Sequence, residues 1–206
     1  MSDLQKKLLK ALIVGKPNVG KSTLVNSLVG EKVSIVSRKA QTTQKNTTGV
    51  ITKDNSQLIF FDTPGLNKIE KNIRISETFK AVAENVDVLI YMVDNTKKSQ
   101  SIDDHFSYWL NNNQSRFKKK ILIVNKIDCI EKVKLFEITK TINGIINFDE
   151  TFFISLRKKS GIESFYKWIE KQAYSNDWVF QKSYKSNIGK KTFLSELTRE
   201  KIFKYI

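Results

Sequence analysis

A glycine-rich loop near the start of the chain has the residue types and spacing that bind phosphate. Residues 15–22 read Gly-Lys-Pro-Asn-Val-Gly-Lys-Ser, which matches the pattern G-x-x-x-x-G-K-[ST]. Its glycines let successive backbone N–H groups converge on phosphate oxygens, and a helix that begins there adds the positive end of its dipole. We predict that Lys21 reaches the β- and γ-phosphates of a nucleotide and that Ser22 ligates Mg²⁺. The predicted binding residues are Gly15, Lys16, Pro17, Asn18, Val19, Gly20, Lys21, Ser22 and Thr23.

A second motif, Asp-Thr-Pro-Gly at 62–65, directly follows the apolar run 58–61. An aspartate at the end of a strand can hold Mg²⁺ through a water molecule, and Gly65 has no side chain to keep its N–H away from a γ-phosphate. Alone, this tetrapeptide would be an ordinary turn. Downstream of a phosphate-binding loop it predicts the rest of the metal and phosphate site. The predicted residues are Asp62, Thr63, Pro64, Gly65 and Leu66.

A third motif, Asn-Lys-Ile-Asp at 125–128, indicates which base is bound. The carboxylate of Asp128 can accept hydrogen bonds from the N1–H and the exocyclic amino group of guanine, a donor pair that adenine lacks. We expect Asn125 to brace the surrounding loops and the stem of Lys126 to lie along the base. The backbone amides of residues 155–157 are candidates for contact with guanine O6. The predicted base-site residues are Asn125, Lys126, Asp128, Ser155, Leu156 and Arg157.

The polar segment Gln-Thr-Thr-Gln-Lys at 41–45 could supply another metal ligand. A threonine here can ligate Mg²⁺ once the segment closes over a γ-phosphate. We prefer Thr43 to Thr42, which makes Ser22, Thr43 and Asp62 the predicted metal ligands. The alternative is a polar surface loop without a role in binding.

Short apolar runs alternate with helical patterns along the chain, which predicts an α/β fold with a mostly parallel sheet covered by helices on both faces. Each motif then follows the carboxyl end of a strand, where ligands bind in such sheets. A strand before the phosphate loop and a helix after it argue against a chance match of the pattern. The six predicted strands are residues 12–14, 48–52, 58–61, 86–93, 120–124 and 151–154. The predicted helices are residues 22–29, 73–83, 102–110, 133–146 and 162–173.

Composition favours a folded protein with a polyanionic partner. The 206 residues are 40% hydrophobic, and no run approaches the roughly 20 apolar residues of a membrane-spanning helix. The single cysteine, Cys129, excludes an internal disulfide and fits a reducing, cytoplasmic location. The 36 basic and 21 acidic residues give a net charge of +15, which suits RNA, DNA or an anionic membrane face. A Lys-, Asn- and Ile-rich bias from an AT-rich genome explains the charge equally well.

The motifs resemble those of the Era family of bacterial GTPases. The similarity is carried by residues 15–26, by Val-Ser-Ile-Val-Ser-Arg-Lys-Ala-Gln-Thr-Thr at 33–43, and by Phe-Asp-Thr-Pro-Gly-Leu at 61–66. It implies a Ras-like P-loop GTPase domain over residues 1–175, followed over residues 176–206 by a linker and the first helix of a KH domain. One departure is Gln44, where the family usually has arginine.

The resemblance also implies partners and a cellular role. Family members of this kind bind the small-subunit ribosomal RNA near its 3′ end through the KH domain, act in ribosome assembly and 16S rRNA processing, and associate with the inner face of the membrane. Residues 192–202 resemble the helix that opens that domain, but no glycine follows Gly189, so the family's G-x-x-G RNA clamp is missing. We therefore expect a truncated gene product, a fragment or the first half of a split protein. We also expect the chain to be a monomer. The alternative function is a nucleotide-binding remnant that has lost RNA binding.

Slow hydrolysis of GTP is expected from the residue after the second motif. Leu66 lies where Ras-type enzymes place the glutamine that orients the attacking water, and leucine cannot polarise water. In related GTPases with an asparagine in the phosphate loop, K⁺ replaces the arginine finger, which implies K⁺ at Asn18. The predicted catalytic residues are Lys21, Thr43, Gly65 and Asn18. An ATPase is a further alternative, in which Asp128→Ala would leave nucleotide preference unchanged.

Overall fold

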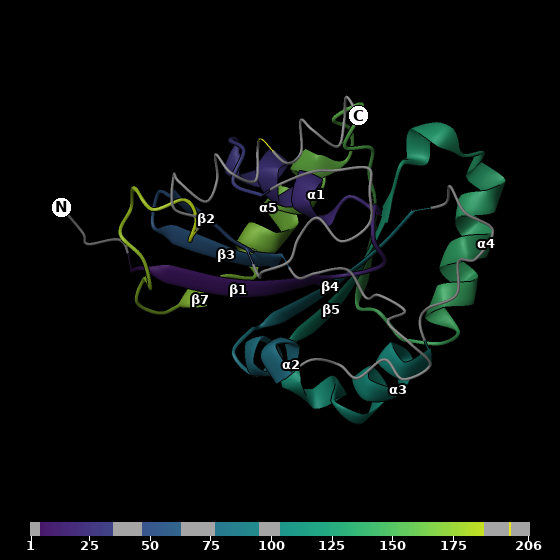
Figure 1. Cartoon of the computed structure of the whole chain (residues 1–206), viewed down its shortest axis with the longest axis horizontal. Coiled ribbons are helices and arrows are strands. Elements are labelled where there is room, and N and C mark those ends of the chain that lie inside the picture. The colour runs from purple at the N-terminus through teal and green to yellow at the C-terminus, as the bar shows by residue number, and fades with distance from the viewer. Residues whose placement is uncertain (1–4, 35–46, 63–76, 95–103, 188–197, 199–206) are drawn as a thin grey trace.

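The core of the molecule is a twisted sheet with helices on both faces (Figure 1). The computed structural model describes residues 5–34, 47–62, 77–94, 104–187 and 198. Along the sheet the strands follow the order β2-β3-β1-β4-β5-β6, and the antiparallel strand β7 pairs with the start of β1. The strands are β1 (Lys7–Val14), β2 (Thr47–Lys53), β3 (Ser56–Asp62), β4 (Val88–Asp94), β5 (Lys119–Asn125), β6 (Glu150–Phe153) and β7 (Tyr174–Ser175).

The predicted fold class is confirmed, and the sheet adds a short strand to the six expected. The pairs β1–β3, β1–β4, β4–β5 and β5–β6 are parallel, and β2–β3 is an antiparallel hairpin. Strand β1 begins at Lys7, five residues earlier than predicted, because the side chains of Leu8 and Leu9 are also buried. Strand β4 pairs only with residues 11–14 of β1, which leaves room for β7 beside Lys7 and Leu8.

Within the described ranges, five helices pack on the two faces of this sheet, and coverage of both faces is as predicted. Helices α1 and α5 cover one face and share one apolar cluster with it, whereas α2, α3 and α4 cover the other face and share a second cluster (Figure 1). Parallel strands buried on both faces explain the nearly continuous apolar runs in the sequence. The helices are α1 (Lys21–Val29), α2 (Glu77–Ala83), α3 (Asp104–Asn112), α4 (Lys132–Asn143) and α5 (Ile162–Lys171).

Beyond β7, residues 176–187, here called the strap, pack against the β2–β3 hairpin. Gln57 of β3 is fully buried and accepts hydrogen bonds from the backbone N–H groups of Val179 and Phe180, each at 3.0 Å. The stacked rings of Phe180 and Tyr184, with centroids 4.2 Å apart, join a small apolar cluster around Val50. The strap thereby covers part of β2, the edge strand of the sheet.

The predicted C-terminal helix at 192–202 lies outside the described residues except for Thr198, which is helical. Within the described part of the chain, every helix is too short or too polar to cross a membrane.

Candidate functional site

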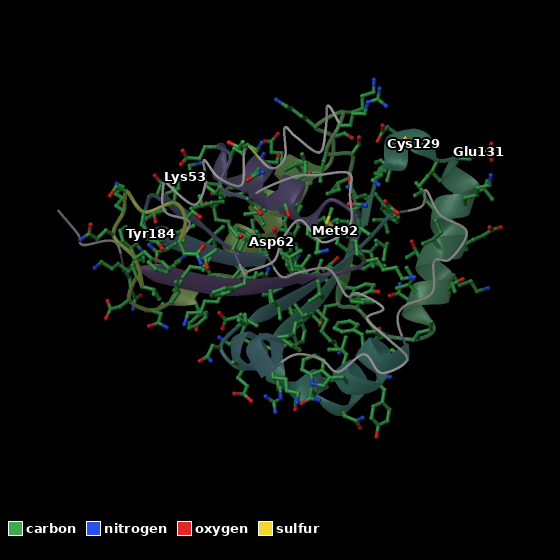
Figure 2. All side chains as sticks on the ribbon, viewed as in Figure 1. Lys53, Asp62, Met92, Cys129, Glu131 and Tyr184 are labelled. Carbon is green, nitrogen blue, oxygen red and sulfur yellow. The ribbon has the colours of Figure 1, made fainter. Side chains whose placement is uncertain are left out.

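The phosphate loop lies at the carboxyl edge of the sheet, between β1 and α1 (Figure 1). Its two glycines have backbone φ angles of 149° at Gly15 and 112° at Gly20, which side chains rarely allow. A Cβ atom at Gly15 would overlap the carbonyl oxygen of Met92, and one at Gly20 would overlap the Asn125 side chain. The ends of β4 and β5 therefore press on the loop and require glycine at both positions. Met92 is labelled in Figure 2 near the centre of the molecule.

The ammonium group of Lys21 is folded back onto the loop. Its Nζ donates hydrogen bonds to the carbonyl oxygens of Gly15 at 2.9 Å and Lys16 at 3.0 Å. Burial lowers the pKa of Lys21 to about 8, partly offset by the negative charge of Asp62. A buried cation beside converging backbone N–H groups is suited to phosphate, since phosphate would compensate the charge that burial penalises.

Asp62, labelled in Figure 2, lies at the end of β3 beside the first turn of α1. Its Oδ2 accepts hydrogen bonds from Ser22 Oγ at 2.6 Å and from Ser34 Oγ at 2.7 Å. Burial raises the pKa of the Asp62 carboxyl, whereas both hydrogen bonds and the charge of Lys21 lower it.

The donor set beside Asp62 fits Mg²⁺. Among the described residues, Asp62 Oδ1 is the buried side-chain oxygen without a hydrogen-bond partner. Buried polar atoms are nearly always paired, so such an orphaned oxygen calls for a ligand or a water. A carboxylate and a serine hydroxyl are oxygen donors of the kind that this hard cation prefers. Ser22 and Asp62 would hold the metal, with a water between it and Asp62.

Asn125 joins the two sides of the site. Its Nδ2 donates to the carbonyl oxygen of Val19 at 2.8 Å, and its Oδ1 accepts from the backbone N–H of Leu156 at 3.3 Å. One buried amide thus connects the phosphate loop to the loop that follows β6.

Asp128 presents an exposed carboxylate beside this bridge. Ser155 Oγ donates to Asp128 Oδ1 at 2.5 Å, and this hydrogen bond is the largest cause of the lowered pKa of Asp128. Hydrogen bonding by Cys129 and the charge of Arg157 lower the pKa further. The group is therefore held in the ionised form, which accepts hydrogen bonds but cannot donate them.

Lys126 reaches across the site from a left-handed backbone conformation with φ of 63°. Its Nζ donates to the carbonyl oxygen of Asn18 at 3.0 Å and forms an ion pair with Asp94 at the end of β4. Lys126 therefore ties the base-reading loop to both the phosphate loop and a neighbouring strand.

The structure brings most of the predicted site residues to one edge of the sheet. Lys16, Pro17 and Thr23 are half-buried in or beside the phosphate loop, and Arg157 is exposed next to Asp128. The predicted residues Thr43, Thr63, Pro64, Gly65 and Leu66 lie outside the described residues.

Three residues of the site were not predicted from the sequence: Asn26, Ser34 and Asp94. Asp94 could have been found, because it ends an apolar run at the end of a strand as Asp62 does. Ser34 and Asn26 lie within the segments that resemble the Era family but carry no pattern of their own.

The fold and the site together define the class of P-loop GTPases. The sheet is mostly parallel, and its carboxyl edge holds a phosphate loop, a serine–aspartate pair suited to magnesium, and an Asn-Lys-x-Asp loop. Residues 10–126, over half of the chain, match the family model described as 50S ribosome-binding GTPase. The chain belongs to that family.

Curated relatives confirm the resemblance to Era. The chain is 30% identical over 193 residues to GTPase Era of Brucella melitensis biotype 1, a match that covers 93% of this chain and 61% of the relative. GTPase Era of Agrobacterium fabrum is 33% identical over 193 residues, covering 93% of this chain and 60% of the relative. The chain therefore spans about three fifths of the length of these curated relatives.

Two solved structures of Era are similar to the whole described fold. Era in complex with MgGDPNP and nucleotides 1506–1542 of 16S ribosomal RNA gives a TM-score of 0.81 at 32% identity, covering 95% of this chain and 67% of that one. A single-substitution variant of Aquifex aeolicus Era bound to GDP·AlF4⁻ gives the same TM-score and identity, covering 95% of this chain and 66% of that one.

Proposed function

We propose that the chain binds GTP and GDP with Mg²⁺ and hydrolyses GTP. The observation that carries the proposal is that three kinds of group converge at one edge of the sheet: the ammonium of Lys21, the oxygen donors of Ser22 and Asp62, and the carboxylate of Asp128. Asn125 connects the phosphate loop to the loop that follows β6. A guanine nucleotide bound with Mg²⁺ requires groups of these three kinds at one site. The similar Era structures hold MgGDPNP and GDP·AlF4⁻, which supports the same ligands here.

Different residues bind different parts of the nucleotide and its metal. Lys21 binds the β- and γ-phosphates, Ser22 and Asp62 hold the metal, and Mg²⁺ when bound neutralises charge that develops on the transferred phosphoryl group. We include Thr43 as a metal ligand and Gly65 as a donor to the γ-phosphate. Turnover is slow because Leu66 cannot orient the attacking water.

Guanine recognition rests on the ionised carboxylate of Asp128. It accepts hydrogen bonds from the guanine N1–H and amino group, while Ser155 keeps it in place and ionised. The ion pair with Asp94 holds the Lys126 stem where it can lie along the base. A wrong base would leave the carboxylate unpaired, which penalises adenine.

We further propose that this nucleotide switch acts in assembly of the small ribosomal subunit and processing of its 16S rRNA. The family description names the 50S subunit, but the similar Era structure, which is 32% identical to the chain, contains 16S ribosomal RNA, the RNA of the small subunit, and this favours the small subunit. The net charge of +15 suits an RNA partner. We assign residues 1–175 to a GTPase domain and residues 176–206 to a linker and the first helix of a KH domain.

The same proposal places a monomeric chain in the cytoplasm with peripheral contact to the inner face of the membrane. Basic residues attract an anionic leaflet, so the charge supports this contact too. Sedimentation with anionic vesicles, and its loss at high salt, measures the membrane contact.

Multiple-turnover release of phosphate from GTP tests the main proposal. We expect slow basal release that rises severalfold when purified small subunits are added, with large subunits and ATP as controls. Lys21→Ala should abolish the release of phosphate because it removes the ammonium group that binds the β- and γ-phosphates. GTP binding without any stimulation by small subunits would contradict the ribosomal role and favour the nucleotide-binding remnant.

A further inference from the structure

Ser34 is a fully buried serine directly bonded to the proposed metal aspartate. Its Oγ donates to Asp62 Oδ2 at 2.7 Å, beside the 2.6 Å hydrogen bond from Ser22 Oγ. Two hydroxyl groups therefore occupy one carboxylate oxygen. The other oxygen, Oδ1, is buried and has no hydrogen-bond partner among the described residues.

The side chain of Asn26 in α1 is hydrogen-bonded to the backbone at Ser34. Its Oδ1 accepts from the backbone N–H groups of Val33 at 2.8 Å and Ser34 at 2.7 Å, and its Nδ2 donates to the carbonyl oxygen of Ser34 at 2.6 Å. An amide is the side chain that supplies both an acceptor for two N–H groups and a donor for a carbonyl. The backbone at Ser34 is thus fixed to the helix that begins at the phosphate loop.

This arrangement sets the orientation of the Asp62 carboxylate. With two donors on Oδ2, rotation of the carboxyl group would break both hydrogen bonds inside a buried site, where unpaired polar groups are costly. The donors also oppose the effect of burial, which raises the pKa of Asp62. Removing the Ser34 hydroxyl would leave Ser22 as the remaining hydroxyl donor, although Ser22 is itself a proposed metal ligand.

We propose that Ser34 is a positioning residue of the Mg²⁺ site: with Asn26 behind it, the Ser34 hydroxyl holds Asp62 Oδ2 and so keeps Oδ1 available to a water of the metal shell. The inference rests on the proposed binding of guanine nucleotide with Mg²⁺. Groups that orient metal ligands in this way typically change metal affinity 10- to 100-fold when they are removed.

Release of a fluorescent GDP analogue at increasing Mg²⁺ concentrations tests the role of Ser34. For Ser34→Ala we expect the Mg²⁺ concentration that half-maximally slows release to rise about tenfold, with release in EDTA unchanged. Ser34→Cys replaces the hydroxyl by a somewhat larger thiol that is only a weak donor, so the Mg²⁺ requirement should shift in the same direction. Ser56→Ala, at the opposite end of β3, is the matched control and should leave both quantities unchanged.

A double-mutant cycle tests the role of Asn26. Asn26→Ala should raise the Mg²⁺ requirement as Ser34→Ala does, and the double variant should be no worse than either single variant because both act through the same contact. Thermal unfolding checks that each variant is folded before release is measured.

Two results would overturn the inference while leaving the proposed function intact. One is a wild-type Mg²⁺ requirement in folded Ser34→Ala and Ser34→Cys. The other is a release rate that the substitution raises by the same factor in Mg²⁺ and in EDTA, which would mean that Ser34 supports the loop and not the metal site. A wild-type chain that releases GDP at a rate independent of Mg²⁺ would overturn the proposed metal role itself and this inference with it.

Discussion

At the scale of single residues, the base site combines an exposed carboxylate with a buried frame. Asp128 faces solvent, while Asn125 and Ser155 beside it are buried. The frame fixes where the carboxylate points, and exposure leaves it free to meet a base. Specificity should therefore follow the donor and acceptor pattern of residue 128 more than the shape of the loop.

Asp128→Asn should exchange the base preference from guanine to xanthine. Asparagine replaces one acceptor by a donor, which conflicts with the guanine amino group but matches the C2 oxygen of xanthine. We expect GDP affinity to fall about 10- to 100-fold, the cost of losing a hydrogen bond to a charged group, while XDP affinity rises. Competition against a fluorescent nucleotide measures both. An unchanged preference would remove Asp128 from base recognition and reopen the ATPase alternative.

Ser155→Ala should make guanine binding more sensitive to acid. The hydrogen bond from Ser155 is the largest cause of the lowered pKa of Asp128, so its loss moves that pKa back upward. Affinity depends on the ionised carboxylate, is present above the pKa, and is lost as pH falls through it. GDP affinity in the variant should therefore decline at a higher pH than in the wild type. Identical pH profiles would contradict this role, and Ser160→Ala serves as the exposed control.

Replacing K⁺ by Na⁺ should slow GTP hydrolysis about tenfold, well below the 10³ or more that an arginine finger supplies. Asn18 lies in the phosphate loop with φ of 67°, and its carbonyl oxygen accepts from Lys126. Asn18→Ala should remove the difference between the two ions while leaving GDP affinity within about threefold. Phosphate release in matched KCl and NaCl buffers decides the matter, and equal wild-type rates would exclude K⁺ from the mechanism.

At the scale of elements, the strap links the C-terminal part of the chain to the hairpin beside the site. The backbone N–H of Val50 donates to the carbonyl oxygen of Lys185 at 2.8 Å, and that of Thr48 donates to Asn187 Oδ1 at 2.9 Å. Strand β2 is thus paired with β3 on one side and partly covered by the strap on the other. Covering an edge strand also reduces its tendency to pair with another chain.

Gln57→Leu should release the strap and destabilise the fold. Gln57 accepts from two backbone N–H groups of the strap and donates to the carbonyl oxygen of Phe180 at 2.9 Å. Leucine would leave these groups unpaired and lower the free energy of unfolding by about 2–4 kcal/mol. Urea unfolding measures the loss, and limited proteolysis should cut within 176–187 first. Gln181→Leu, exposed on the same strap, is the control, and equal stability of the two variants would contradict this role.

At the scale of the whole molecule, net charge should separate the two classes of ligand. A charge of +15 attracts any polyanion, whereas the nucleotide is held by a few specific contacts. The two kinds of binding therefore respond differently to salt.

RNA binding should weaken steeply with salt, while GDP binding changes little. If the chain contacts four phosphates of single-stranded RNA, raising the salt from 50 to 200 mM would lower the RNA affinity about 50-fold. Fluorescence anisotropy with a 16S rRNA 3′ fragment and with an unrelated RNA of equal length measures the slope and the specificity. An RNA affinity that does not change with salt would indicate that the positive charge comes from a bias in amino-acid composition and not from RNA binding.

The sequence by itself determined the fold class and predicted most residues of the candidate site. Runs of apolar residues predict buried parallel strands because both faces of such strands are covered, and the glycine and aspartate motifs follow their ends. These signals are local, so strand and helix positions could be predicted within a few residues. The start of β1 at Lys7 was missed because lysines interrupt its apolar pattern, and β7 was missed because two residues form no pattern.

Only the tertiary structure decided which distant side chains meet. Ser34 bonds to Asp62 across 28 positions, Lys126 pairs with Asp94 across 32, and Gln57 bonds to Phe180 across 123. Such contacts depend on the order of strands in the sheet and on the path of the chain between them. Local patterns of hydrophobicity specify neither, because they act over one strand or one helix turn, whereas contacts between elements arise only when the whole sheet is assembled.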